Sequence, residues 1–317
     1  MKAVVIHHAG GPEQLKLEVV PTPKVKKNWS LVKIKGFGIN HSEIFTRNGL
    51  SPSVKFPRIL GIECVGIISQ TTDPKRLPVG QKVVSIMGEM GRNFDGSYAE
   101  YVLIPNDQIY PIKTNLAWST LAAIPETYYT AYGSLLNLHI KSGQMLLVRG
   151  GSSGVGVAFT KLAKALFTEI TVVGSTRQLK KTDQLIDIGY DDVIQDQAGT
   201  LMTGDSYDRV LELIGPTTIK DTFKHVNETG IVCSTGELGG QWCLSNFDPI
   251  MDIAANGYLT SFYSGNVDVQ KLNNLLQLIE KRNIDVKPSK IFSLDKLPQA
   301  HEFLESTESV GKVVVLN

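Results

Sequence analysis

Cysteine is scarce in this sequence. Its 317 residues include three, Cys64, Cys233 and Cys243, which lie far apart. A disulfide framework or a zinc site of four thiolates needs more cysteines at closer spacing. We therefore expect reduced thiols, and the sequence predicts a cytoplasmic protein.

A charge excess and long apolar runs are missing as well. The chain has 32 Lys and Arg against 31 Asp and Glu, a net charge of +1. This balance gives no electrostatic reason for nucleic acid or an anionic membrane to be a partner, so we expect neither. No segment approaches the roughly 18 apolar residues of a membrane span, and the first residues lack the apolar core of a secretory signal.

What the chain does contain is typical of a globular protein, with 42% hydrophobic and 20% charged residues. Its length exceeds the usual size of one hydrophobic core, so we expect two domains. Residues 1 to about 120 combine short apolar runs with many turns, which predicts a mostly antiparallel, barrel-like β domain. The expected strands are Ala3–Ile6, Leu31–Ile34, Val65–Ile68, Lys82–Ile86 and Tyr98–Ile104.

From Leu121 onward, strands alternate with helices. This rhythm predicts a doubly wound parallel sheet with helices on both faces, so the chain is of the α/β class. The expected strands are Gln144–Arg149, Ile170–Gly174, Asp192–Gln195, Asp208–Leu213, Gly230–Ser234 and Tyr258–Phe262, and the helices are Tyr128–Leu136, Val155–Leu166 and Leu179–Ile188. The tail adds helices over Val269–Lys281 and Leu297–Glu305 and strands over Ile291–Leu294 and Gly311–Leu316.

A glycine-rich turn joins the first of these strands to an amphipathic helix. Gly151, Gly154 and Gly156 are spaced as G-x-x-G-x-G. Glycines allow a tight turn and close approach of a diphosphate to the free N–H groups of a helix N-terminus. The turn therefore predicts a dinucleotide site over Gly151, Ser152, Ser153, Gly154, Val155 and Gly156.

The same turn also fits the G-x-S-x-G nucleophile elbow of hydrolases, with Ser152 as the nucleophile. Asp248 and His301 would then complete a triad. The elbow explains neither Gly156 nor the end of the next strand, so we favour the dinucleotide interpretation.

The end of the second strand indicates which dinucleotide binds. An NAD site carries a carboxylate there, which accepts hydrogen bonds from the ribose. Here Ser175, Thr176 and Arg177 are followed by Lys181, and the first carboxylate is Asp183. Hydroxyl, Arg and Lys side chains suit a 2′-phosphate, so Ser175, Arg177 and Lys181 predict NADP(H). The alternative is a solvated basic loop.

Short-chain dehydrogenases are excluded, because none of the ten tyrosines has a Lys four residues later. The sequence instead resembles the quinone oxidoreductase branch of the medium-chain dehydrogenase/reductase superfamily, which also contains the zinc alcohol dehydrogenases. The resemblance covers nearly the whole chain. It rests on residues 1–15, 38–43, 57–63, 96–101, the glycine turn, 236–240 and 311–314.

The resemblance implies two domains. Residues 1–122 and 265–317 would form a GroES-like, β-rich catalytic domain, and residues 123–264 a Rossmann NADP(H)-binding domain. Zinc members carry Cys at the position of Asn40 and His at that of Ile62, before Glu63, and a four-cysteine lobe near residues 85–115. An amide and an alkyl group are poor zinc ligands, so we expect no metal.

The resemblance also implies further cofactor contacts and leaves the catalytic residue unknown. Weak proton-donor candidates are Tyr128, Tyr129 and Tyr263, and solvent is the alternative source because Phe45 replaces a Tyr common in the family's substrate cleft. The further cofactor contacts are Asn40, Thr130, Gly236, Leu238, Phe262, Ser264 and Lys312.

The implied activity is zinc-independent hydride transfer from NADPH to a quinone. An enone or alkenal reductase is the alternative within this chemistry, and an NADPH-binding structural or RNA-binding module is the alternative of another class. Family members usually form homodimers through the edge strand of the Rossmann sheet, here Tyr258–Tyr263.

Overall fold

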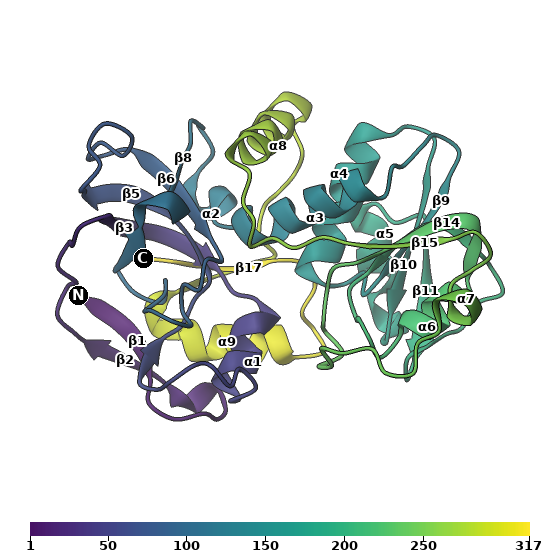
Figure 1. Cartoon of the computed structure of the whole chain (residues 1–317), viewed down its shortest axis with the longest axis horizontal. Helices are drawn as coiled ribbons and strands as arrows, with labels where there is room; N and C mark the ends of the chain where they lie inside the picture. Colours follow the sequence, from purple (N-terminus) through teal and green to yellow (C-terminus); the bar gives the residue numbers. More distant parts are fainter. The chain divides into compact units, whose positions relative to one another are not determined.

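The computed structural model describes all residues from Met1 to Asn317, and the chain divides into two units. Unit 1 comprises Met1–Glu126, Ser264–Ile279 and Val286–Asn317; unit 2 comprises Thr127–Tyr263 and Glu280–Asp285. Figure 1 shows a sheet-rich body for each. The predicted α/β class is confirmed. None of the helices is both long and apolar enough to traverse a lipid bilayer.

Unit 1 contains two sheets built mainly from antiparallel strands. One has the order β2-β1-β4, and the other β16-β17-β3-β5-β6-β8, with β7 also paired to β3. The elements are β1 (Lys2–Ile6), β2 (Leu15–Val19), β3 (Trp29–Gly38), α1 (His41–Arg47), β4 (Arg58–Ile59), β5 (Glu63–Gln70), β6 (Lys82–Ile86), β7 (Tyr101–Pro105), β8 (Tyr110–Pro111), α2 (Trp118–Leu121), α8 (Val269–Arg282, whose last turn belongs to unit 2), β16 (Lys290–Ser293), α9 (Leu297–Glu305) and β17 (Val313–Leu316), with short 3-10 turns at Pro12–Gln14, Asn106–Gln108 and Leu294–Lys296.

Strand β3 is the centre of the larger sheet. It pairs with β5 on one side and with β7 and β17 on the other, all antiparallel. Its apolar residues are buried in a core that draws on both sheets and on α9. Gly66 of β5 is required by this close pairing, because a Cβ there would lie 2.3 Å from the carbonyl oxygen of Lys33.

A buried polar network joins α9 to α1, which lie side by side in Figure 1. Arg47 donates to both carboxylate oxygens of Glu305, at 3.0 and 2.9 Å, and lies 3.1 Å from Nδ1 of His301. The other ring nitrogen of His301 lies 2.9 Å from the hydroxyl of Tyr98. His301 thus serves the core of unit 1, which removes it from any hydrolase triad.

Unit 2 is a seven-stranded sheet of the order β12-β11-β10-β9-β13-β14-β15, parallel except for β12. Helix α4 packs on β9 and α5, and α6 packs on β13 and β14 (Figure 1). The elements are α3 (Pro125–Asn137), β9 (Met145–Arg149), α4 (Gly154–Leu166), β10 (Thr171–Thr176), α5 (Thr182–Ile188), β11 (Asp192–Gln197), β12 (Thr200–Leu201), β13 (Tyr207–Glu212), α6 (Ile219–Phe223), β14 (Val226–Ser234), α7 (Pro249–Asp252) and β15 (Tyr258–Ser261), with a 3-10 turn at Leu179–Lys181.

Several expected boundaries differ from the structure, and at two of them part of the expected element has another conformation. The helix expected over Leu179–Ile188 begins at Thr182, because Leu179–Lys181 forms a 3-10 turn. The strand expected over Tyr98–Ile104 begins at Tyr101, because Ala99 instead makes an isolated bridge to Ala3. Residues of the same polarity occur in a regular helix or strand and in the turn or bridge beside it, so the sequence pattern does not fix where the regular element begins.

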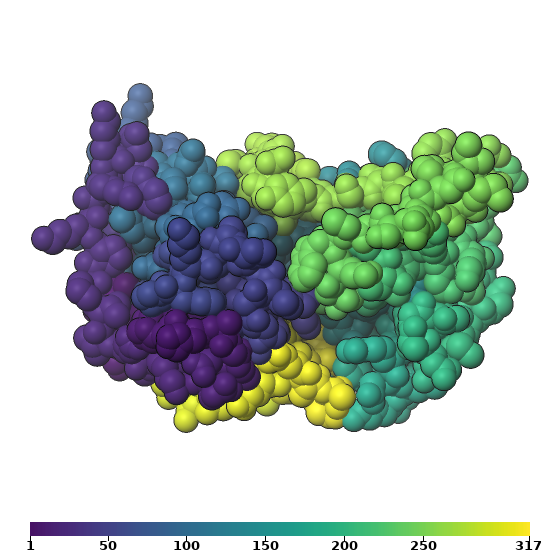
Figure 2. All heavy atoms as spheres, turned by 60° about the horizontal axis from the view of Figure 1, so that its bottom comes forward, coloured from purple at the N-terminus to yellow at the C-terminus, as the bar shows by residue number.

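Strand β15 is the free edge of the unit 2 sheet. The green segment that contains α7 and β15 is exposed on the face shown in Figure 2. Several of its large apolar side chains are exposed, including Ile250 and Met251 of α7 and Tyr258 and Leu259 of β15.

Candidate functional site

The glycine turn of unit 2 follows β9 and leads directly into α4. Gly150 has a φ of +89°, a left-handed conformation that favours glycine. Ser153 is the N-cap of α4, and its Oγ accepts a hydrogen bond from the Gly156 N–H at 3.1 Å. A serine N-cap satisfies one of the N–H groups that a helix start leaves without a partner.

Close backbone approach explains why glycine stands at Gly156. A Cβ there would lie 2.8 Å from the carbonyl oxygen of Gly150 and 3.0 Å from that of Gly151. Both neighbours are backbone atoms, so neither can move aside without deforming the turn. The third glycine of the motif thus fixes the contact between the helix start and the strand end.

Two buried side chains support the turn from below. The hydroxyl of Tyr190 donates to the carbonyl oxygen of Gly151 at 2.9 Å. The Oγ of Ser175 accepts from the N–H of Gly150 at 3.1 Å. The sequence analysis did not identify Tyr190. The signal in the sequence is Gly174, because a Cβ there would lie 2.8 Å from the Tyr190 ring.

The start of α4 presents N–H groups to solvent. The N–H groups of Gly154 and Val155 have no hydrogen-bond partner within the chain, and both residues are half-buried rather than enclosed. Oriented N–H groups at the positive end of a helix dipole attract anions. This geometry fits a diphosphate.

The expected 2′-phosphate residues lie at the end of the neighbouring strand β10. Ser175 is 1% exposed and faces the turn, whereas Arg177 is exposed and Lys181 half-buried. Strand β10 pairs with β9 in parallel, so its end lies beside the glycine turn. Both cations thus follow β10 at this edge of the sheet.

A second turn, which contains Gly236 and Leu238, adjoins the glycine turn. The N–H of Leu238 donates to the carbonyl oxygen of Leu213 at 3.1 Å, and a Cβ on Gly150 would contact both Leu213 and Leu238. The carboxylate of Glu212 accepts from the N–H groups of Ile214 and Gly215 at 2.7 and 3.1 Å. The structure thus brings these two expected cofactor segments together.

Helix α3 carries Thr130 and two of the tyrosine candidates. Tyr128 is buried, and burial, with the charge of Asp285 adding to it, raises the pKa of its phenol. Tyr129 is fully buried and packs edge-on against Phe262, with ring centroids 5.8 Å apart. Tyr263 is 63% exposed. A raised pKa makes the Tyr128 phenol a poorer proton donor at neutral pH.

In unit 1, Asn40 and Lys312 meet at Glu63. The ammonium of Lys312 donates to Oδ1 of Asn40 at 2.6 Å, to Oε1 of Glu63 at 2.7 Å and to the carbonyl oxygen of Ile39 at 3.3 Å. An ammonium has three N–H donors, so all of them are used within the unit. The amide of Asn40 donates to Glu63 Oε1 at 2.9 Å.

A second carboxyl group, Glu43, lies beside this cluster. Its Oε1 accepts from the amide of Asn40 at 3.4 Å and from the N–H of Ile62 at 3.3 Å, and its Oε2 is buried without a partner. Burial raises the pKa of Glu43 to about 7; the ammonium of Lys312 opposes this rise and the charge of Glu63 adds to it. Ser264, also in unit 1, donates to Glu126 at 2.7 Å.

These donors do not fit a zinc ion. The Lys312 ammonium already takes the oxygen atoms of Asn40 and Glu63, and Ile62 offers no ligand atom. No group of three or more His, Cys, Asp or Glu side chains is arranged to hold a metal. Zinc prefers nitrogen and sulfur ligands, which this cluster lacks.

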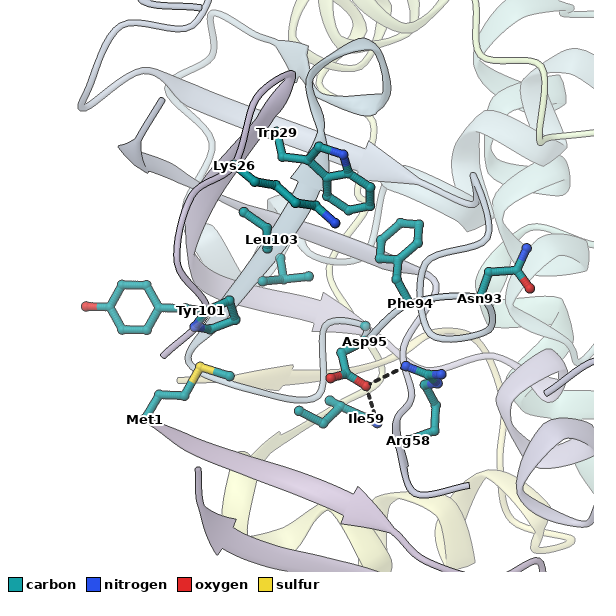
Figure 3. Close-up of a pocket in the computed structure, with 13 residues that line it drawn as sticks. Met1, Lys26, Trp29, Arg58, Ile59, Asn93, Phe94, Asp95, Tyr101 and Leu103 are labelled. Carbon is teal, nitrogen blue, oxygen red and sulfur yellow. Dashed lines mark hydrogen bonds and ion pairs between the residues drawn. The ribbon is translucent and has the colours of Figure 1, made fainter. Parts of the chain in front are cut away.

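A surface pocket of about 270 Å³ lies elsewhere in unit 1. Figure 3 shows Lys26 over the ring of Trp29, which in turn contacts the edge of Phe94. An ion pair between Arg58 and Asp95, 2.9 Å long, closes one side. None of the expected cofactor or catalytic residues lines this pocket.

Comparisons with known proteins agree with this architecture. The family described as "Alcohol dehydrogenase GroES-like domain" matches residues 26–114, and "Zinc-binding dehydrogenase" matches residues 188–315. The quinone oxidoreductase of Lama guanicoe is 27% identical over 331 residues, covering 100% of this chain and 97% of the relative. The mouse quinone oxidoreductase is 27% identical over 342 residues, covering 100% and 98%.

Solved structures share the fold over the whole chain. The quinone oxidoreductase of Coxiella burnetii is 25% identical with a TM-score of 0.85, covering 100% of this chain and 99% of that one. The Escherichia coli quinone oxidoreductase, whose structure contains NADPH, is 22% identical with a TM-score of 0.85, and each chain is covered completely.

Together, the two sheets, the glycine turn and the matched families define a two-domain oxidoreductase of the dehydrogenase/reductase type. The chain is similar over its whole length to the quinone oxidoreductase branch of the medium-chain dehydrogenase/reductase superfamily.

Proposed function

We propose that this chain is an NADPH-dependent quinone oxidoreductase that acts without zinc. The observation that carries the proposal is the pairing of two features on adjacent strand ends. The glycine turn presents the free N–H groups of Gly154 and Val155, and Arg177 directly follows the next strand, where an NAD site would have a carboxylate.

NADPH binding follows from the charges at this edge of the sheet. We assign the diphosphate to the start of α4 and the 2′-phosphate to Arg177 and Lys181, while Ser175 supports the turn through Gly150. Related structures support this cofactor, since those of the Escherichia coli enzyme and of a mycobacterial relative both contain NADPH. The other expected contacts belong to the same proposal and rest on family resemblance: Asn40, Thr130, Gly236, Leu238, Phe262, Ser264 and Lys312.

The reaction requires little of the protein beyond binding and orientation. Bound NADPH supplies a hydride, and a quinone is already polarised enough to accept it without a metal. The chain's contribution is to hold the reacting carbon atoms at contact distance. The reduced quinone also takes up a proton. Because Tyr128 is buried and its pKa is raised, we propose that solvent donates this proton rather than that tyrosine.

A titration of the purified protein with NADPH and with NADH tests the cofactor assignment. Arg177→Ala should weaken NADPH binding about tenfold and leave NADH unchanged, because only NADPH carries the 2′-phosphate. The control is Lys141→Ala, an exposed cation that precedes β9 at the other end of the strand. Equal losses for both dinucleotides would exclude the 2′-phosphate assignment.

Turnover with a panel of quinones, enones and alkenals tests the substrate class. Faster NADPH oxidation with quinones supports the proposal, and preference for enones or alkenals would make the chain a carbon–carbon double-bond reductase. NADPH binding without turnover on any acceptor would instead favour a binding module.

We also propose a homodimer that forms through β15. The strand is the free edge of its sheet, and Tyr258 and Leu259 are 60% and 38% exposed. Exposed strand edges with apolar side chains are usually covered by another chain.

A further inference from the structure

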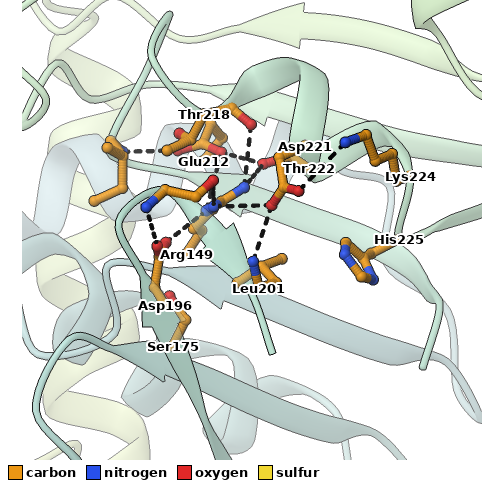
Figure 4. A network of polar contacts seen from close by, with 12 residues as sticks. Arg149, Ser175, Asp196, Leu201, Glu212, Thr218, Asp221, Thr222, Lys224 and His225 are labelled. Atoms are coloured by element: carbon orange, nitrogen blue, oxygen red, sulfur yellow. Dashed lines mark hydrogen bonds and ion pairs between the residues drawn. The ribbon is translucent and has the colours of Figure 1, made fainter. Parts of the chain in front are cut away.

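Arg149 is an unusual residue for the end of a central strand. It is the last residue of β9, directly before Gly150, and it is completely buried. Figure 4 shows its guanidinium surrounded by polar partners from other strands and from α6. Its nitrogen atoms contact Asp196 at 2.9 Å, the carbonyl oxygens of Thr218 and Gly199 at 3.1 and 2.8 Å, Thr222 Oγ1 at 2.8 Å and Asp221 at 3.1 Å.

Three carboxylates share this single buried cation. Asp196 is 2.9 Å from Nε of Arg149, Asp221 is 3.1 Å from its Nη2, and Glu212 is 4.0 Å from its Nε. Burial raises the pKa of Glu212, although Arg149 and the hydrogen bonds from Thr222, Gly215 and Ile214 oppose the rise. Removing the guanidinium would therefore leave an excess of negative charge at this place.

Asp196 lies on the strand next to the one that Arg177 follows. Strands β10 and β11 are parallel, and Thr176 pairs with Gln195. Arg177 directly follows Thr176 at the end of β10, and Asp196 follows Gln195 within β11, so the two residues come from neighbouring strands, whose spacing is about 4.8 Å. Arg149, in turn, pairs with Glu212 across β9 and β13.

A carboxylate near the end of β10 would affect whether NADH or NADPH binds more tightly. An unpaired carboxylate accepts hydrogen bonds from the ribose hydroxyls of NADH and repels the 2′-phosphate of NADPH. Strand β10 has no such carboxylate, but Asp196 on the next strand supplies one. Its Oδ2 is occupied by Arg149 at 2.9 Å and its Oδ1 by the N–H of Gly199 at 3.0 Å.

We propose that Arg149 determines dinucleotide specificity by neutralising Asp196, so that the phosphorylated cofactor is not repelled. Arg149 is buried beneath the strand end and acts through Asp196, so it is a positioning residue rather than a cofactor ligand. The inference rests on the proposed NADPH-dependent function and identifies the residue pair that sets its cofactor preference.

The test measures the dissociation constants of NADPH and NADH and takes their ratio. Asp196→Asn removes one carboxylate and keeps Arg149, so the preference for NADPH should rise about threefold. Arg149→Met leaves Asp196 unpaired, so the preference should fall about tenfold. The double variant loses both charges, and its preference should return to within about twofold of the wild type.

A matched control separates charge from structure. Thr222→Val removes a hydrogen bond to Arg149 and one to Glu212 without changing any charge. Its melting temperature should fall while its NADPH preference stays unchanged. Arg149→Lys keeps the positive charge and should likewise retain the preference for NADPH.

The outcomes distinguish the two proposals. If the wild type binds NADPH but Asp196→Asn leaves the preference unaltered, the role of the pair is overturned; Asp196→Asn carries this test even if Arg149→Met does not fold. If Arg149→Met weakens NADPH and NADH equally, Arg149 is merely structural. If the wild type binds neither dinucleotide, the proposed function fails as well.

Discussion

The ammonium of Lys312 lies 2.7 Å from Oε1 of Glu63, with the Lys312 side chain 5% exposed and that of Glu63 fully buried. The pair joins β17 to β5 through the segment just before Val313. Since both charges are removed from water, each depends on the other for compensation.

Lys312→Met should therefore destabilise the protein strongly. Breaking a buried pair from one side leaves an uncompensated carboxylate and typically costs about 3–5 kcal/mol of unfolding free energy. Chemical denaturation followed by circular dichroism measures this loss. The control is Lys16→Met on the exposed side of β2 in the same unit, which should change stability by less than about 0.5 kcal/mol. Similar values for both variants would show that the pair contributes nothing.

Gly156→Ala should weaken binding of NADPH and NADH alike, by about tenfold or more. The added Cβ would meet the Gly150 carbonyl oxygen at 2.8 Å and push the start of α4 away from the turn that holds the diphosphate. Gly204→Ala is the matched control, because nothing lies within 4 Å of a Cβ there. Fluorescence titration with each dinucleotide measures the effect; unchanged affinity in Gly156→Ala would place the diphosphate elsewhere.

His301 should make the protein sensitive to acid. Burial, with the charge of Arg47 and then of His41 adding to it, lowers the pKa of His301 from 6.5 to about 3. The unfolded chain takes up a proton on this ring below about pH 6.5 and the folded chain does not, so stability is lost as the pH falls from 6.5 towards 3. At pH 5 the loss is about 2 kcal/mol.

His301→Gln tests this contribution, because a glutamine can still bond to Tyr98 and does not titrate. Between pH 7.5 and pH 5 the melting temperature of the wild type should fall more steeply than that of the variant. Parallel pH profiles for the two proteins would mean that His301 is not the group responsible.

Leu259→Lys should shift the protein towards the monomer. The substitution places a charge on the free edge of β15, where the proposed partner strand would bury Leu259. Sedimentation velocity at several concentrations measures the assembly. Val19→Lys is the control, since Val19 is 83% exposed on β2 of the other unit. A wild-type protein that sediments as a monomer at every concentration would rule out the dimer.

The features predictable from the sequence are those set by local patterns. The glycine turn, the strand before it and the helix after it form where the apolar periodicity and Gly151, Gly154 and Gly156 place them. The cations after β10 were also visible, because Arg177 follows directly on a strand whose end was clear.

Contacts between distant residues could not be predicted in this way. In the sequence, Arg149 is a single charged residue at the end of a predicted strand. Its partners Asp196 and Thr222 come 47 and 73 residues later, so the local pattern does not reveal them. The hydrogen bond from Lys312 to Glu63, 249 residues away in the sequence, likewise has no signal in the local pattern. Such pairings depend on strand order, which hydrophobic patterning alone does not specify.

The order of strands in unit 1 has a consequence for biosynthesis. Strand β17 lies between β16 and β3, so the larger sheet cannot close until Val313–Leu316 has been made. The ribosome completes β3 and the strands of unit 2 well before that. During translation, the part of β3 that β17 later covers, Gly36–Gly38, lacks this partner strand, and an unpaired strand edge is prone to aggregation in that interval.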